Sequence, residues 1–120
     1  MAPDFYAALR HFKRTEFEYP YEMDEDLLRK LDIARSLAGI PFVINDDYRT
    51  PEDNERVGGK KNSAHLRGLA VDIACPDSHT RHLMYDGLRT AGFRRIGIGS
   101  NFMHADIDDS LPPEVTWLYK

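Results

Sequence analysis

The chain has 120 residues, of which 42% are hydrophobic and 30% charged, and its 6 Phe, 6 Tyr and 1 Trp can build a globular core, which excludes a disordered protein. No apolar run approaches the ~20 residues of a membrane-spanning helix, and a net charge of −4 excludes a sequence-independent nucleic-acid binder, which needs a basic surface. The single cysteine, Cys75, excludes an internal disulfide, so the core must stabilise the fold, with or without a metal.

In the N-terminal third of the chain, the sequence pattern clearly predicts one amphipathic helix. A short helix is expected over residues 2–13, with Pro3 in its first turn, and an extended segment over residues 15–21. Asp24 can then cap an amphipathic helix that ends at Gly39. Its apolar residues recur at steps of three and four and form one face: Leu27, Leu28, Leu31, Ala34, Leu37 and Ala38.

The middle of the chain predicts a strand, a short helix and a loop. The apolar run 40–44 is typical of a buried strand. Thr50 can cap a helix with Pro at its first position, and Gly58 and Gly59 would stop it. The polar residues 60–68 predict a loop.

The C-terminal half predicts three strands and a helix. In order, we expect a strand over residues 69–73, a helix capped by Asp77 or Ser78 and closed by Gly92, and strands over 95–98 and 102–107 joined by a turn. Helices and strands do not alternate regularly, which indicates an α+β fold with a mainly antiparallel sheet flanked by helices. With no repeat or linker, residues 1–120 are expected to form a single domain.

His65 and Asp72 are a possible pair of metal ligands. They are seven residues apart, which is about 10 Å along a helix and roughly 23 Å along an extended chain, too far to share an ion. They converge only if the chain folds back between them, and Gly68 supplies a backbone that allows such a turn.

A second polar pair lies on the last predicted strand. On a strand over residues 102–107, His104 and Asp106 point to one face, and their apolar neighbours point to the other. Together, His65, Asp72 and His104 would supply two imidazoles and one carboxylate. That set leaves the fourth position of a zinc ion open to water, as in a catalytic site. The alternative interpretation is that these are separate surface groups or hydrogen-bonded core groups.

Two motifs carry a resemblance to a known family. Residues 63–72 match the pattern S-x-H-x-x-G-x-A-x-D, and residues 104–106 match H-x-D. The runs at 38–44 and 48–54 are similar to the segment that precedes the first motif. The chain, from about Met23 onward, therefore resembles the zinc D-alanyl-D-alanine carboxypeptidase family. This family includes D-Ala-D-Ala dipeptidases and phage endolysins and shares its fold with hedgehog domains.

The resemblance implies a zinc metallopeptidase of hedgehog/DD-peptidase-like fold. His65, Asp72 and His104 would bind Zn²⁺ in the cleft, and a zinc-activated water would hydrolyse the stem peptides of peptidoglycan. The implied reaction is of the D-Ala-D-Ala carboxypeptidase type, because the match extends to a segment that is linked to recognition of a free carboxylate.

The resemblance also implies two substrate-binding residues. Arg49, in a match to Y-R-[ST]-P, would hold the terminal carboxylate, for which a planar guanidinium is suited. The alternative for Arg49 is a salt bridge to Asp46 or Asp47, and these acids would weaken the binding of an anionic peptide unless they point away. Ser63 would donate a hydrogen bond to the substrate or, alternatively, stabilise its loop.

The chain departs from the family at the general base. Asn101 stands where many relatives carry Glu or Asp, three residues before the last histidine. Asp106 would then be the catalytic base, or it would orient a ligand. Alternatively, the domain is a catalytically weak or inactive module that binds zinc and a wall peptide or a partner protein.

Other reactive residues have simpler interpretations. His79 and His82 are expected on a helix surface, although their spacing would also allow them to share a metal. Cys75 is expected to be a buried, inert thiol. Trp117 and Tyr119 are expected in the core or in the wall of the cleft.

The sequence also leads to expectations about location and partners. Residues 1–17 lack the ~7–15 residue apolar core of a signal peptide, so a cytoplasmic or phage-associated protein is expected, which acts on the cell wall after release. The expected partner is a peptidoglycan stem peptide rather than nucleic acid or a membrane. A monomer is expected, and the oligomeric state is left open because no coiled-coil stripe or long exposed apolar run is visible.

Overall fold

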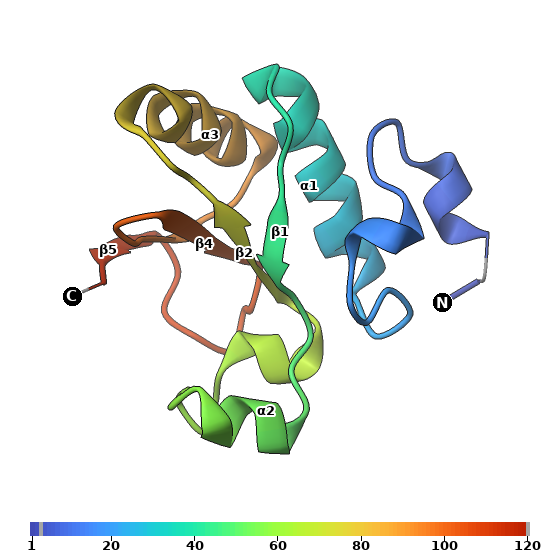
Figure 1. Cartoon of the computed structure of the whole chain (residues 1–120), viewed down its shortest axis with the longest axis vertical. Coiled ribbons are helices and arrows are strands. Elements are labelled where there is room, and N and C mark those ends of the chain that lie inside the picture. Colours follow the sequence, from blue (N-terminus) through green and yellow to red (C-terminus); the bar gives the residue numbers. More distant parts are fainter. Residues whose placement is uncertain (3, 120) are drawn as a thin grey trace.

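Five strands form one mixed sheet in the order β1-β2-β4-β3-β5 (Figure 1). The computed structural model describes residues 1–2 and 4–119 of the chain. The strands are β1 (Ile44–Asp46), β2 (Ala70–Ala74), β3 (Arg95–Ile98), β4 (Phe102–Asp106) and β5 (Val115–Leu118). Only β3 and β5 pair in parallel, so the predicted α+β class with a mainly antiparallel sheet is confirmed.

Three α-helices flank the sheet. They are α1 (Glu25–Ala38), α2 (Pro51–Arg56) and α3 (Ser78–Ala91). In Figure 1, α3 lies above the strands, α1 to the right of β1 and α2 below the strands. Three short 3₁₀ turns complete the structure: η1 (Phe5–Ala8), η2 (Arg14–Glu16) and η3 (Ala64–Arg67). No helix in the described part of the chain has both the length and the apolar character needed to cross a membrane.

The predicted caps and ends of the three α-helices are confirmed. Asp24, Thr50 and Asp77 each accept a hydrogen bond from a backbone N–H in the first turn of their helix. Gly39 and Gly92 end α1 and α3 in the left-handed conformation.

The core lies between the helices α1 and α3 and one face of the sheet. Alternate residues of β2 and β4 point into it, including Val71, Ile73, Met103 and Ala105, all of which are buried. The other face of these strands carries Asp72, His104 and Asp106.

Leu37 does not belong to the buried face of α1, contrary to its predicted place there. Its exposed fraction is 53%, whereas Leu28 is fully buried. Leu37 follows Leu28 by nine residues, which is two and a half turns, so it points to the opposite side of the helix.

The N-terminal predictions are wrong. The expected helix over residues 2–13 is a single 3₁₀ turn, and residues 15–21 begin with η2 instead of extending; Pro3 lies outside the described residues. The carboxylate of Asp32 accepts hydrogen bonds from the backbone N–H groups of Arg10 and His11, which a longer helix would need internally.

Three further boundaries differ from prediction. The run 40–44 is not a strand, because β1 begins only at Ile44 and Val43 is 60% exposed. The predicted loop over residues 60–68 contains η3. The edge strand β5 was not predicted, because its residues alternate between half-buried and exposed and form no apolar run.

Gly68 makes the turn between η3 and β2 possible. Its φ is +69°, and a Cβ added there would lie 2.1 Å from the backbone oxygen of Glu22. Gly39 has the same φ, yet a Cβ there would meet nothing within 4 Å. The two glycines therefore share the same backbone strain and differ in their surroundings.

We expect Gly68→Ala to lower the free energy of unfolding by about 1–3 kcal/mol more than Gly39→Ala, because only the first substitution adds a collision with backbone to the left-handed strain. Urea unfolding of both variants measures the difference. Equal losses of unfolding free energy would show that the backbone around Gly68 can shift to accommodate a Cβ without further destabilisation.

Candidate metal centre

The turn at Gly68 brings His65 back over β2. The Oγ of Ser63 accepts a hydrogen bond from the backbone N–H of His65 at 3.3 Å and so caps η3. The backbone N–H of Arg49 donates to the carbonyl oxygen of His65 at 3.0 Å, which fixes η3 against the segment after β1. The fold-back that the spacing of His65 and Asp72 required is therefore present.

Strand pairing places the other two residues. In the antiparallel register of β2 and β4, Asp72 lies directly opposite His104, and both point to the face away from the core. Ligand atoms of His65, Asp72 and His104 all lie within 4.8 Å of one another. Asp72 Oδ1 is 3.3 Å from His65 Nε2 and 3.0 Å from His104 Nδ1. The three residues can thus hold one metal ion.

Hydrogen bonds fix which nitrogen of each ring faces Asp72. His65 Nδ1 donates to the carbonyl oxygen of Asp47 at 2.7 Å, and the buried Nε2 has no hydrogen-bond partner among the described residues. His104 Nε2 donates to Asp106 Oδ2 at 2.7 Å, so its Nδ1 faces Asp72. An unpartnered buried nitrogen is costly, and a metal ion would satisfy it. The donor set of two imidazoles and a carboxylate suits zinc.

Asp106 lies behind His104 and has no free oxygen. It is 1% exposed. Its Oδ1 accepts from Arg95 Nε at 2.8 Å and from the backbone N–H of Asp108 at 3.1 Å, and its Oδ2 accepts from His104. Of the two roles predicted for Asp106, this geometry favours orienting the ligand.

The protonation of the triad follows from these contacts. Burial alone would raise the pKa of Asp72, but the hydrogen bond from His104 and the neighbouring imidazole of His65 hold it well below its usual range. Burial would lower the pKa of His104, but the hydrogen bonds to Asp106 and Asp72 outweigh it and raise that pKa. Without a metal, His104 therefore favours a proton on both nitrogens.

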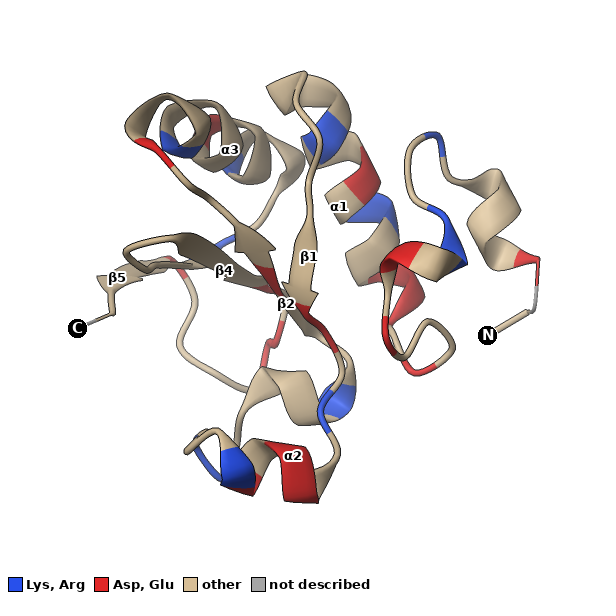
Figure 2. Ribbon diagram, viewed as in Figure 1, with Lys and Arg blue, Asp and Glu red and all other residues tan. Residues whose placement is uncertain are grey.

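Arg49 lies beside the triad in a salt bridge, as one predicted alternative had it. Its Nε donates to Asp46 Oδ2 at 2.6 Å and its Nη1 to Asn54 Oδ1 at 3.2 Å, while its Nη2 is 3.7 Å from Asp72 Oδ2. Asp46 and Asp72 are partners on the adjacent strands β1 and β2, where acidic residues meet in Figure 2. The guanidinium therefore lies between two carboxylates.

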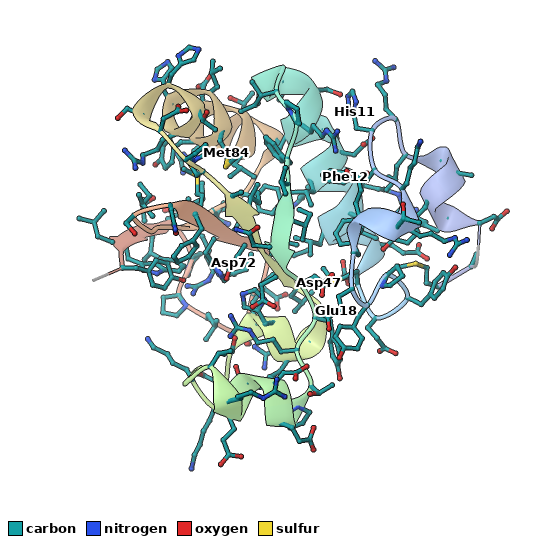
Figure 3. The ribbon with its side chains drawn as sticks, viewed as in Figure 1. His11, Phe12, Glu18, Asp47, Asp72 and Met84 are labelled. Atoms are coloured by element: carbon teal, nitrogen blue, oxygen red, sulfur yellow. The ribbon has the colours of Figure 1, made fainter. Side chains whose placement is uncertain are left out.

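The carboxylate of Asp47 points away from Arg49. Its Oδ2 accepts from the backbone N–H of Glu18 at 2.7 Å, and Figure 3 shows Asp47 next to Glu18. Burial raises the pKa of Asp47. Because its carbonyl oxygen also holds His65, Asp47 links the N-terminal segment to the triad. No sequence pattern indicates this role, because the contact is made by a main-chain atom.

An aromatic wall stands beside His104. The rings of Trp117 and Tyr119 have centroids 5.4 Å and 6.4 Å from that of His104. Gly97, opposite His104 in the sheet, leaves room for them, because a Cβ there would lie 2.5 Å from the ring of Tyr119. Of the two predicted places for these aromatic residues, the structure favours the wall.

The remaining candidates lie apart from the triad. A cavity of about 660 Å³ is lined by Arg95 and Asp106, among others, but by no residue of the triad. His79 and His82 are exposed on α3 and belong to no group of potential metal ligands in the described part of the chain. Cys75 is buried as predicted, and burial raises the pKa of its thiol. Asn101 lies in the turn between β3 and β4, where its carbonyl accepts from the backbone N–H of Cys75.

A comparison with protein families places the site within a known family. A family model described as Peptidase M15 matches residues 7–108, a range that contains the whole triad and ends before β5. No curated protein matches the chain.

Proposed function

Since the chain belongs to the peptidase M15 family, whose members are zinc-dependent, we propose that it is a zinc metallopeptidase that cleaves the stem peptides of peptidoglycan. The observation that carries the proposal is the convergence of His65 Nε2, Asp72 and His104 Nδ1, with hydrogen bonds on the opposite ring nitrogens that turn these two nitrogens toward Asp72. We propose the specific reaction to be D-Ala-D-Ala carboxypeptidase-type hydrolysis in a single domain of hedgehog/DD-peptidase fold over residues 1–120, acting as a monomer.

His65, Asp72 and His104 would hold the zinc. When bound, zinc would lower the pKa of a water molecule toward ~7 and polarise the scissile carbonyl. The carbonyl of Asp47 and the carboxylate of Asp106 keep the two imidazoles in the tautomers that ligation needs.

Two residues are proposed to bind the substrate. Arg49 Nη2 faces the triad, while Nε and Nη1 are engaged elsewhere, so Nη2 is the group to hold a terminal carboxylate. The hydroxyl of Ser63 accepts from His65 N–H and keeps its own proton to donate to a substrate.

A second candidate function is a module of the same fold that binds a wall peptide without turnover. Asn101 favours it, because an amide cannot act as a base in the position where relatives carry an acid. The engagement of both oxygens of Asp106 favours it as well.

Digestion of purified muropeptides by zinc-loaded protein, read by mass spectrometry, separates these functions. Zinc-dependent loss of a terminal D-Ala, absent from a chelated control, is the expected result. Cleavage of an internal bond would support a metallopeptidase but contradict the carboxypeptidase specificity. If zinc is demonstrably bound and no product forms, the result would favour the binding module.

Zinc binding is expected to depend on pH through His104. Because the carboxylates raise the pKa of His104, a proton occupies Nδ1 below that raised pKa, and zinc must displace it. Zinc affinity is therefore full above the raised pKa and falls as the pH decreases through it. We expect an equimolar addition of zinc to raise Tm more at about pH 8 than at about pH 6. Equal shifts at both values would contradict this description of His104.

A further inference from the structure

Arg95 contacts three parts of the structure around the triad. From β3, its Nε donates to Asp106 Oδ1 at 2.8 Å and its Nη1 donates to the carbonyl oxygen of Pro112 at 2.5 Å. Its guanidinium carbon lies 5.2 Å from the ring centroid of Trp117. Its side chain is only 13% exposed. Arg95 thus joins β4, the loop after β4, and β5.

Strand register explains why Arg95 reaches Asp106. Arg95 lies directly opposite Asp106 in the antiparallel pair of β3 and β4, so both side chains point to the face that carries the triad. Two residues before Asp106 in β4, His104 points to the same face and donates to the other oxygen of Asp106. One oxygen of the Asp106 carboxylate therefore accepts a hydrogen bond from Arg95, and the other accepts one from His104.

A carboxylate that is 1% exposed keeps its charge and its orientation only if cationic or N–H donors surround it. Beside His104, Asp106 has two donors, Arg95 and the backbone N–H of Asp108. Arg95 is the charged one, and replacing its side chain removes it without altering the backbone.

We propose that Arg95 is a positioning residue for the metal site. Arg95 fixes the orientation of the Asp106 carboxylate. Asp106 can then accept the hydrogen bond from Nε2–H of His104, which leaves Nδ1 of His104 facing Asp72. The same guanidinium also contacts Trp117, so Arg95 positions both the ligand His104 and the aromatic residues beside it. The proposal rests on the proposed zinc site, since its function is to prepare a ligand.

The test compares Arg95→Gln with Arg95→Lys and with a matched control, Arg94→Gln. Arg94 is the preceding residue, with its side chain 57% exposed and paired with Glu114. We measure Zn²⁺ affinity by competition with a chelator, and the slowly exchanging Nε2–H signal of His104 by NMR in metal-free protein.

Arg95→Gln is expected to weaken zinc affinity by about 10–100-fold and to broaden or remove the Nε2–H signal, as loss of an outer partner of a ligand does. Arg95→Lys should restore part of both readouts, because an ammonium can neutralise Asp106 without reaching Pro112 and Trp117 together. Arg94→Gln should leave both unchanged.

A double-mutant cycle with Asp106→Asn shows whether Arg95 acts through Asp106. If it does, Arg95→Gln costs no further zinc affinity in the Asp106→Asn background. A variant that loses thermal stability but keeps both zinc affinity and the Nε2–H signal would overturn the proposal, since Arg95 would then be only structural.

The two proposals fail separately. If wild-type protein bound no zinc, the zinc site would be refuted, and the Nε2–H signal would still decide about Arg95. Loss of the signal in Arg95→Gln would support the positioning of His104, and its retention would overturn it.

Discussion

Replacing His65 or His104 by alanine is expected to abolish zinc retention and peptide hydrolysis together. Each substitution removes one of three protein ligands, so the loss of zinc affinity should exceed the about 10–100-fold that follows from losing a mere outer partner. Hydrolysis depends on the ion and should fall below detection. Zinc content after dialysis and digestion of muropeptides measure the two effects on the same samples.

Alanine at either position also leaves a cavity, because both histidines are buried. Circular dichroism and the Tm of the metal-free variants therefore separate loss of the ligand from loss of the fold. His79→Ala is the matched control, because His79 is exposed on α3 and lies outside the triad. Full activity in His65→Ala or His104→Ala would refute the assignment of the metal site.

Asp106→Asn is expected to separate the two roles considered for Asp106. If Asp106 orients His104, the variant binds zinc about 10–100-fold more weakly but retains hydrolysis when zinc is saturating. If Asp106 were the general base, the variant would keep its zinc and lose turnover.

The physical reason lies in the hydrogen-bond pattern of an amide. The oxygens of Asp106 face two N–H donors on one side and His104 Nε2 on the other. An Asn that keeps its oxygen toward Arg95 turns its NH₂ group to His104, which then carries its proton on Nδ1, the nitrogen needed for zinc. Zinc titration followed by kinetics at saturating zinc distinguishes the two results, and unchanged zinc affinity with lost turnover would contradict the orienting role.

Local signals in the sequence predicted much of what positions the site. The N-cap residues Asp24, Thr50 and Asp77 predict where their helices begin, because capping hydrogen bonds form within one turn. The spacing of His65 and Asp72 required a fold-back, and Gly68 identified where it occurs. These features depend on residues close in the chain, so one sequence is enough to recognise them.

Contacts that depend on strand register could not be predicted in this way. Arg95 reaches Asp106 only because β3 and β4 pair as they do, and Trp117 approaches His104 only because β5 adds in parallel to β3. The carbonyl of Asp47 holds His65 through an atom that every residue possesses. Tertiary contacts also explain the N-terminal errors, since the side chain of Asp32 replaces helical hydrogen bonds there.

Anomalous diffraction from crystals grown with one equivalent of zinc, recorded at the zinc absorption edge, tests the central claim most directly. We predict a single strong peak between His65 Nε2, the carboxylate of Asp72 and His104 Nδ1, and its loss in crystals of His104→Ala. A peak elsewhere, for example at His79 and His82, or none at the triad while zinc is present in solution, would contradict the assignment of this group as the metal centre.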